Sequence, residues 1–348
     1  MSQLPSSQDF IYQDEILQGV SRTFALTIPQ LPEQLRSVVG NAYLLCRIAD
    51  TIEDEVTLST NQKRFFTDQF INVVDGKETA KVFANKLSPL LSDKTLASER
   101  DLIKNTDRII RITQSYNLNQ KNALTTCVRI MAKGMADYQE KETLNGLLNL
   151  EALDDYCYYV AGVVGEMLAK LFCDYSDEIN TNHDILMKLS VSFGQGLQMT
   201  NILKDIWDDQ KRGACWLPQE TFSKYGFDLS DLSSSGSGNN SPAFQQGLGE
   251  LLGLARNHLE NALQYTLLIP RHEKGIRKFC LWAIGMAILT LNKINKNRAF
   301  IHSAQVKISR KEVKRTIALT NLFVSNDQLL KLLFYSASRG LPTNRVHG

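Results

Sequence analysis

The sequence predicts an all-α protein, and three observations lead to this prediction. Apolar residues recur with helical spacing through most of the 348 residues, whereas no stretch alternates apolar and polar residues clearly enough for a strand. The chain has only 8 prolines and 20 glycines, which is little turn punctuation for a β-sandwich. Hydrophobic residues make up 43% and charged residues 22%, so we expect a folded globular chain rather than a disordered or fibrous one.

Turn residues divide this periodicity into separate helices. The breaks fall at Pro29 and Pro32, Pro89, 117–119, 180–182, Pro218 and Pro270. A stretch rich in serine and glycine near 230–242 predicts a flexible loop inside one domain that covers residues 1–348. The predicted helices cover residues 9–20, 32–54, 61–74, 98–115, 119–140, 150–172, 183–211, 243–268, 273–297, 310–323 and 326–338.

Composition excludes several classes of function. The net charge of +2 gives no overall field to attract nucleic acid, so we expect no nucleic-acid partner. The six cysteines form no CxxC pair and the five histidines form no HExxH, which leaves little support for a Cys/His zinc site. We expect buried, reduced thiols in a cytoplasmic protein.

Two short acidic motifs carry the clearest chemistry. Residues 50–54 (DTIED) and 205–209 (DIWDD) both follow the pattern D-x-x-(D/E)-D. Residues four apart share one face of a helix, so the first and last aspartates of each motif lie side by side. Carboxylates placed in this way repel each other unless a cation binds between them, and their hard oxygen atoms suit Mg²⁺.

Each motif continues a polar stripe along its helix. The first stripe consists of Tyr43, Arg47, Asp50 and Asp54, and the second of Gln198, Asn201, Asp205 and Asp209. An isolated acidic motif is most often a solvated face, but these stripes are narrow and flanked by apolar residues. We therefore expect the stripes to face each other across one large helical bundle, where they line a central apolar cavity with an acidic mouth.

Three further stretches fit such a cavity, although each also has an ordinary structural interpretation. Residues 21–24 (SRTF) offer a guanidinium and hydroxyls for phosphate oxygens, but this signal is weak alone. Gly162 and Gly165, which follow a tyrosine-rich turn, either allow close helix contact or leave room for a bulky ligand. Residues 211–213 (KRG) form either a helix C-terminus that complements the helix dipole or a lid over a bound anion.

No segment has the pattern of a membrane anchor. The N-terminus lacks the basic start and apolar core of a signal peptide. The longest apolar run, residues 279–291, is shorter than the roughly 20 residues that a membrane-spanning helix needs. We expect a monomeric protein that contacts membranes only peripherally, through apolar residues around the mouth of the cavity.

Together these motifs resemble the squalene/phytoene synthase family, the head-to-head isoprenoid synthases. The resemblance covers roughly residues 15–320. It rests on SRTF (21–24), YLLCRIADTIEDE (43–55), YCYYVAGVVGEML (156–168) and LQMTNILKDIWDDQKRGACWLP (197–218). The resemblance implies an all-α isoprenoid-synthase bundle in which two aspartate-rich motifs hold Mg²⁺ against prenyl diphosphates.

The resemblance also implies roles for individual residues. The implied metal-binding set is Asp50, Glu53, Asp54, Asn201, Asp205 and Asp209. The residues implied to contact diphosphate are Ser21, Arg22, Tyr43, Arg47 and Gln198, with Phe24 along the prenyl channel and Tyr156 in proton transfer. Lys204 stands where the family usually has arginine, which keeps the charge but loses bidentate pairing. Ala214 replaces another family arginine, and Lys211 or Arg212 is expected to supply that charge instead.

The implied reaction joins two farnesyl diphosphates through presqualene diphosphate. Hydride from NADPH then gives squalene, whereas simple proton loss gives dehydrosqualene or phytoene. Residues 277–291 and 305–313 are similar to C-terminal segments of squalene synthases, so Lys307 and Arg310 are candidates for binding the NADPH phosphate. An ordinary basic helix start is the alternative interpretation of 305–313. A non-catalytic helical assembly factor is a remote alternative, because every acidic position of both motifs is filled.

Overall fold

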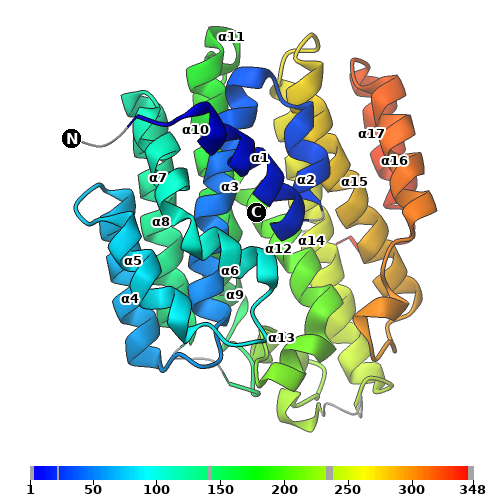
Figure 1. Cartoon of the computed structure of the whole chain (residues 1–348). Helices are drawn as coiled ribbons and strands as arrows, with labels where there is room; N and C mark the ends of the chain where they lie inside the picture. The colour runs from blue at the N-terminus through cyan, green and yellow to red at the C-terminus, as the bar shows by residue number, and fades with distance from the viewer. Residues whose placement is uncertain (1–3, 22, 140–142, 233–237, 344–348) are drawn as a thin grey trace. The chain divides into compact units, whose positions relative to one another are not determined.

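The computed structural model confirms the all-α class (Figure 1). It describes residues 4–21, 23–139, 143–232 and 238–343. Within these ranges the regular secondary structure is entirely helical, and the only β-type pairing is an isolated bridge between residues 147 and 218.

The chain divides into two compact units. Unit 1 contains Met1–Glu140 and Glu166–His183, and unit 2 contains Lys141–Gly165 and Asp184–Gly348. The expectation of a single domain over residues 1–348 stays a prediction.

Unit 1 is built around the long helix α3. Its helices are α1 (Ser7–Val20), α2 (Phe24–Thr27), η1 (Ile28–Gln30), α3 (Glu33–Asp54), α4 (Thr60–Val74), α5 (Ala80–Leu87), η2 (Ser88–Leu90), α6 (Ala97–Lys104), α7 (Thr106–Ser115), α8 (Leu118–Gln139) and α11 (Asp177–Asn180). Helix α3 packs against α1, α4, α6, α7 and α8. Its apolar stripe, which includes Leu44, Leu45 and Ile48, is fully buried. This burial fixes α3 along its whole length.

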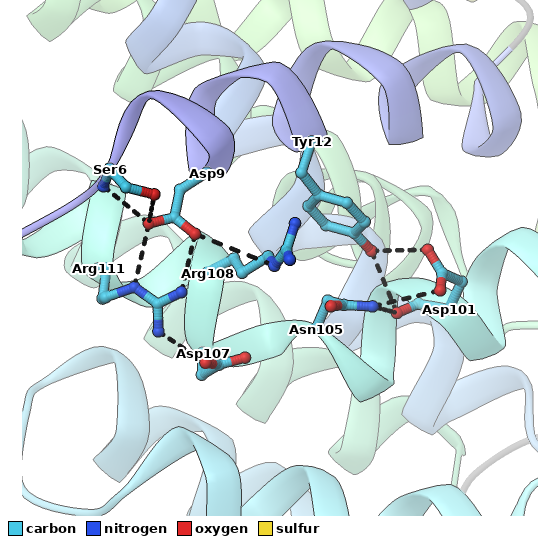
Figure 2. A network of polar contacts seen from close by, with 8 residues as sticks. All are labelled: Ser6, Asp9, Tyr12, Asp101, Asn105, Asp107, Arg108 and Arg111. Carbon is cyan, nitrogen blue, oxygen red and sulfur yellow. Dashed lines mark hydrogen bonds and ion pairs between the residues drawn. The ribbon is translucent and has the colours of Figure 1, made fainter.

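Polar contacts attach α1 to the rest of unit 1 (Figure 2). The buried carboxylate of Asp9 accepts hydrogen bonds from Nε and Nη2 of Arg111 at 3.1 and 2.8 Å. The Arg111 hydrogen bonds lower the pKa of Asp9 to about 2, because they favour its charged form. The hydroxyl of Tyr12 donates to Asp101, and the guanidinium of Arg108 lies over the Tyr12 ring. These contacts hold α1 against α6 and α7.

Unit 2 contains the second long polar helix, α12. Its helices are α9 (Leu150–Cys157), the π-helical turn η3 (Tyr158–Gly162), α12 (His183–Arg212), α13 (Gln219–Ser223), η4 (Leu229–Asp231), α14 (Pro242–Leu268), α15 (Lys274–Lys296), η5 (Ser303–Gln305), α16 (Arg310–Phe323) and α17 (Asp327–Ala337). Helix α10 (Val163–Tyr175) begins in unit 2 and continues into unit 1.

Two glycines let the backbone of α12 lie in direct contact with the backbone of residues 161–165. A Cβ on Gly165 would lie 2.0 Å from the carbonyl oxygen of Ser190, and one on Gly194 would lie 2.1 Å from that of Ala161. Neither position leaves room for a side chain. Of the two interpretations of the glycines in the tyrosine-rich segment, close helix contact is therefore correct for Gly165.

The C-terminal half of α12 is anchored by aromatic side chains. Trp207 is 1% exposed, and its ring centroid lies 6.4 Å from that of Phe244 on α14. Phe244 in turn stacks on Phe222 and contacts Phe227, at 5.3 Å in each case. Trp207 stands between Asp205 and Asp209 in the sequence, so its burial fixes the rotation of α12 and with it the direction of both carboxylates.

The observed helices differ from the predicted ones in several places. Helices α5 and α13 were not predicted, because eight and five residues are too few to show a helical period. The predicted helix 98–115 is interrupted at Asn105. The side-chain amide of Asn105 donates hydrogen bonds to the carbonyl oxygen and to the side chain of Asp101, and these bonds compete with the backbone hydrogen bonds of a continuous helix. The predicted helix 150–172 contains the π-helical turn η3 at the glycine crossing.

The predicted loop near 230–242 lies only partly in the described chain. The η4 turn covers its first residues and α14 begins at Pro242, while residues 233–237 lie outside the described residues. All six cysteines lie within the described ranges; they are buried, and none forms a disulfide, which confirms the prediction of buried free thiols. No described helix combines the length and apolar character needed to cross a bilayer.

Candidate functional site

The first acidic motif occupies the last turn of α3. Asp50, Glu53 and Asp54 all lie within five residues of the helix end at Asp54, and this turn contains no basic residue. The C-terminal end of a helix carries partial negative charge, so carboxylates there are electrostatically unfavourable. The last turn of α3 therefore places three carboxylates next to a helix end whose own partial charge is negative.

Arg47 lies one turn before these carboxylates and is the nearest cation on α3. Its Nη1 atom lies 3.7 Å from Asp50 and 3.6 Å from Glu99 on α6, and its Nη2 donates to the Tyr43 hydroxyl at 3.3 Å. Its Nε atom is buried and has no hydrogen-bond partner. Because its ion pairs are long and one of its donors is unused, the Arg47 guanidinium can still form hydrogen bonds to another anion.

Burial raises the pKa of Asp50 to about 6, although Arg47 opposes the change. The charges of Asp54 and Glu99 raise it further. Burial alone would lower the pKa of Arg47, but Asp50, Tyr43 and Glu99 bring it above its ordinary value. The charge on Asp50 is therefore only partly compensated.

The 21–24 segment stands beside this stripe. The hydroxyl of Ser21 accepts a hydrogen bond from the Phe24 backbone N–H at 2.9 Å, so it begins the short helix α2. The ring of Phe24 lies 5.2 Å from that of Tyr43, whose hydroxyl donates to the Val20 carbonyl. The structure thus brings Ser21, Phe24 and Tyr43 together at the α3 stripe. Arg22 lies outside the described residues.

Glu55, the residue after the first motif, is a structural clamp that the sequence did not reveal. Its side chain is 2% exposed, and one oxygen accepts from the Thr57 N–H and hydroxyl at 3.0 and 2.8 Å. The other oxygen accepts from the Ser92 N–H and the Thr95 hydroxyl. Although burial opposes it, these hydrogen bonds lower the pKa of Glu55 to about 2. Glu55 therefore ties the end of α3 to the segment that leads into α6.

Glu99 is a second functional candidate that the sequence analysis missed. It stands in the first turn of α6 and accepts from the Leu96 N–H at 3.4 Å, as many helix-starting glutamates do. Only the tertiary contact with Arg47 distinguishes it. A pattern search along one helix cannot find such a residue.

In unit 2, the second stripe runs along α12 from the half-buried Gln198 to the buried Asp209, and Asn201 is its exposed member. Lys204 lies 3.1 Å from Asp205 and within 3.4 Å of the Asn201 side-chain oxygen. Burial raises the pKa of Asp205 despite this lysine. Gln198 is half-buried one turn earlier on the same helix. The structure thus brings Asn201, Lys204 and Asp205 into one polar cluster.

Asp209 and Arg212 end this stripe. Asp209 is 6% exposed and forms an ion pair with Arg212 in the last turn of α12. Burial raises the pKa of Asp209 to about 6, against the lowering effect of Arg212. Gly213 follows with a φ of +94°, a conformation that favours glycine and ends the helix. Residues 211–213 therefore form a helix C-terminus, and a role of Arg212 as a lid stays a prediction.

Tyr156 is buried at the end of α9. Its ring stacks on Trp216 with centroids 4.0 Å apart and planes within 6°. The Trp216 segment is fixed by backbone hydrogen bonds, in which Cys215 donates to Thr143 and Leu147 donates to Leu217. The stacking sets the plane of the Tyr156 ring.

Lys307 and Arg310 are both exposed at the N-terminal end of α16. Ser309 caps this helix, because its hydroxyl accepts from the Glu312 N–H while Glu312 accepts from the Ser309 N–H. The ordinary interpretation of 305–313 as a basic helix start is therefore correct for its structure. A nucleotide-binding role for the two cations stays a prediction.

The oxygen donors of both motifs suit Mg²⁺ in type and number. Within the described ranges, no group of three or more His, Cys, Asp or Glu side chains could hold a metal ion by itself. Mg²⁺ typically takes one or two carboxylates and completes its shell with water and phosphate oxygens. Asp50 is half-buried and Asp209 is buried, the charge of each is only partly compensated, and each belongs to a motif with a second carboxylate four residues away. This donor chemistry fits Mg²⁺ better than it fits zinc.

The all-α architecture, with paired aspartates near the ends of two long helices, is that of the isoprenoid-synthase fold. The chain is similar to the structure of TcSQS in complex with BPH1237, with a TM-score of 0.75 and 23% identity over 97% of this chain and 94% of that one. A dehydrosqualene synthase complex gives a TM-score of 0.64 at 20% identity, over 94% of this chain and 97% of the other. These similarities establish the fold.

The sequence establishes the family. A model of the squalene/phytoene synthase family matches residues 17–312, and the chain belongs to this family. It is 33% identical to a squalene synthase of Cyberlindnera jadinii over 84% of this chain and 63% of that protein. It is 31% identical to squalene synthase ERG9 of Candida albicans (strain SC5314 / ATCC MYA-2876) over 87% of this chain and 65% of that protein. The chain thus spans slightly less than two thirds of the length of these curated relatives.

The partly compensated charge of Asp50 predicts that Asp50→Asn stabilises unit 1 in metal-free buffer. The folded-state pKa of Asp50 is raised, so its ionisation penalises the folded state as pH rises through about 6. We expect the variant to be more stable than the parent chain by about 1–2 kcal/mol at pH 8, and the gain to vanish below about pH 4. Thermal unfolding in EDTA at both pH values measures this.

Asp68→Asn, which changes an exposed aspartate on α4, is the matched control and should leave the midpoint unchanged. A variant Asp50→Asn that is less stable than the parent chain at pH 8 would show that this carboxylate stabilises the fold.

Proposed function

We propose that this chain catalyses the head-to-head condensation of two farnesyl diphosphates to presqualene diphosphate, and then its reduction by NADPH to squalene. Membership of the squalene/phytoene synthase family and the curated squalene synthases among its relatives support the reaction class. One structural observation carries the proposal furthest. In each unit, a carboxylate held near a helix end at a raised pKa lies beside a basic side chain.

The two motifs would serve the diphosphates of the substrates. Mg²⁺ held by Asp50, Glu53 and Asp54, and by Asn201, Asp205 and Asp209, would supply positive charge to the departing diphosphate and so ease cleavage of the C–O bond. A purely structural acidic face would not need buried carboxylates with raised pKa values. The sequence and structure therefore support a role in cation binding.

The basic side chains of the chain would hold and orient the diphosphates. Arg47 has an unpaired buried Nε and two long ion pairs, so it can form closer hydrogen bonds to phosphate oxygens. Lys204 offers a point charge beside Asp205, in place of a bidentate guanidinium. Arg212 would add charge at the end of α12.

Aromatic side chains would protect the carbocation that cleavage leaves. The rings of Phe24 and Tyr43 lie together beside the α3 stripe, and their faces can stabilise positive charge without forming a bond to it. The hydroxyl of Tyr156 would take part in proton transfer as the cyclopropane of the intermediate closes. Stacking on Trp216 limits the motion of the Tyr156 ring and so keeps its hydroxyl in one direction.

The second half-reaction would need a reductant. NADPH would supply the hydride that ends the rearranged cation, with release of the second diphosphate and formation of NADP⁺. Lys307 and Arg310 are exposed and form no ion pair within the described part of the chain, so both charges are available to a nucleotide phosphate. We further propose that the protein contacts membranes peripherally, because its substrates and product carry long apolar chains. We also propose that it acts as a monomer.

Product analysis tests the condensation. With farnesyl diphosphate and Mg²⁺ but no nicotinamide, we expect presqualene diphosphate, and EDTA should abolish its formation. Asp209→Asn should lower kcat at least about 100-fold, because it weakens charge stabilisation of the leaving diphosphate. Asp231→Asn, which changes an exposed aspartate of η4, is the control and should change kcat by less than about threefold. Turnover that persists in EDTA would contradict the metal requirement.

The nicotinamide step is tested through the two cations at α16. Replacing both residues (Lys307→Ala with Arg310→Ala) should raise the KM for NADPH about 10- to 100-fold and leave presqualene diphosphate formation unchanged. Lys296→Ala, an exposed lysine at the end of α15, is the control and should leave this KM unchanged. If the parent chain forms the same dehydrosqualene or phytoene with and without NADPH, the reductive step is wrong and the condensation stands.

A further inference from the structure

The C-terminal helix pair of unit 2 carries an unusual charge distribution. Residues 307–339 contain seven lysines and arginines against two carboxylates, an excess of five positive charges. The whole chain has a net charge of +2, so the remaining residues together carry an excess of three negative charges. This helical pair therefore carries a net positive charge, whereas the rest of the chain is slightly negative overall.

Both carboxylates of this segment are already engaged. Glu312 caps α16 and forms an ion pair with Lys293 at 2.9 Å. Asp327, at the start of α17, binds Arg271 at 2.7 Å and also the fully buried Arg277. Neither acidic group is free to neutralise the exposed cations of α16 and α17.

The exposed cations lie on the outward faces of the two helices. On α16, Lys311, Lys314 and Arg315 are exposed at helical spacing. On α17, Lys331 is exposed, and Arg339 follows just beyond the helix end. None of these five side chains forms an ion pair with any residue that the structure describes. Their charge is directed to solvent without compensation.

Large apolar side chains share these outward faces. Leu322 is 72% exposed, Leu332 is 63% exposed and Tyr335 is 49% exposed. Tyr335 is held in place because its hydroxyl donates to Glu260 at 2.8 Å, and Glu260 lies 3.5 Å from Arg256. Helices α16 and α17 contact each other and both pack on α15, so their exposed faces point away from α15 (Figure 1).

We propose that this basic–apolar surface, defined by Lys311, Lys314, Arg315, Leu322, Leu332 and Tyr335, docks the protein on an anionic lipid bilayer. Cations attract anionic headgroups, leucines enter the acyl boundary and a tyrosine ring suits the interface between them. The apolar component is what favours a bilayer over a soluble polyanion, which would be served by the cations alone. The proposal concerns a surface separate from the two acidic stripes and does not depend on the reaction.

The proposal also locates the membrane contact differently from the sequence analysis. Apolar residues around a cavity mouth were expected to provide it, whereas the α16–α17 surface supplies both charge and exposed apolar area. The cations at 314 and 315 lie beyond the pair proposed for NADPH, so the two roles can be separated by substitution.

Vesicle sedimentation with the full chain tests this proposal. Vesicles of phosphatidylcholine alone should retain little protein, and vesicles with equal amounts of phosphatidylcholine and phosphatidylglycerol should retain most of it. High salt should reduce this binding, because it screens headgroup attraction. A double charge reversal, Lys314→Glu with Arg315→Glu, should weaken partition at least about tenfold. The control Lys81→Glu with Lys94→Glu makes the same change in net charge on exposed residues of unit 1 and should weaken partition less than about threefold.

A second variant tests the surface without changing its charge. Leu332→Ser should lower binding to the anionic vesicles several-fold while leaving the circular dichroism spectrum and product formation in detergent unchanged. Equal binding to both kinds of vesicle would overturn the proposal. So would equal losses in the surface and control double variants, or binding to heparin with no binding to anionic vesicles.

Discussion

The burial of carboxylates near the C-terminal ends of α3 and α12, with only partial compensation, is the constraint on which the proposed site depends. Burial raises the pKa of Asp50 and of Asp209 to about 6 although a basic residue lies near each. Both aspartates also lie close to the end of a helix whose dipole opposes negative charge. A bound divalent cation would remove this cost, and we propose that the same arrangement serves to bind metal and diphosphate.

The surrounding structure keeps these carboxylates in place. Glu55 fastens the end of α3 by accepting hydrogen bonds from the segment around Ser92, so the last turn cannot fray despite its charge. In unit 2, Trp207 inserts among phenylalanines on the opposite side of α12 and fixes its rotation. The glycine crossing at Gly165 and Gly194 brings α12 into backbone contact with the chain that follows Tyr156. The acidic ends of both helices are thus held in place by residues outside the two polar stripes.

Much of this could be predicted from the sequence, because helix period and acidic spacing are local properties. The pattern located α3 and α12 to within one residue at each end, and it identified the stripes around Asp50 and Asp205. Glu99 could not be found, since its role arises from a contact between α6 and Arg47 that no local pattern records. The hydrogen bonds of Glu55 to Ser92 and Thr95 could not be predicted either, because these residues are distant in the sequence. In the sequence, Glu55 looks like one more carboxylate of the acidic motif. The choice between close packing and ligand space at Gly165 also needed the neighbouring backbone.

We propose that the acidic motif of each unit binds Mg²⁺ together with diphosphate. Thermal unfolding with Mg²⁺ and inorganic pyrophosphate measures this most directly. We predict a rise in midpoint only when both are present, and a clearly smaller rise in Asp54→Asn and in Asp209→Asn than in the parent chain. If both single variants kept the full rise of the parent chain, the motifs would not bind metal-bound diphosphate and the proposal would be wrong.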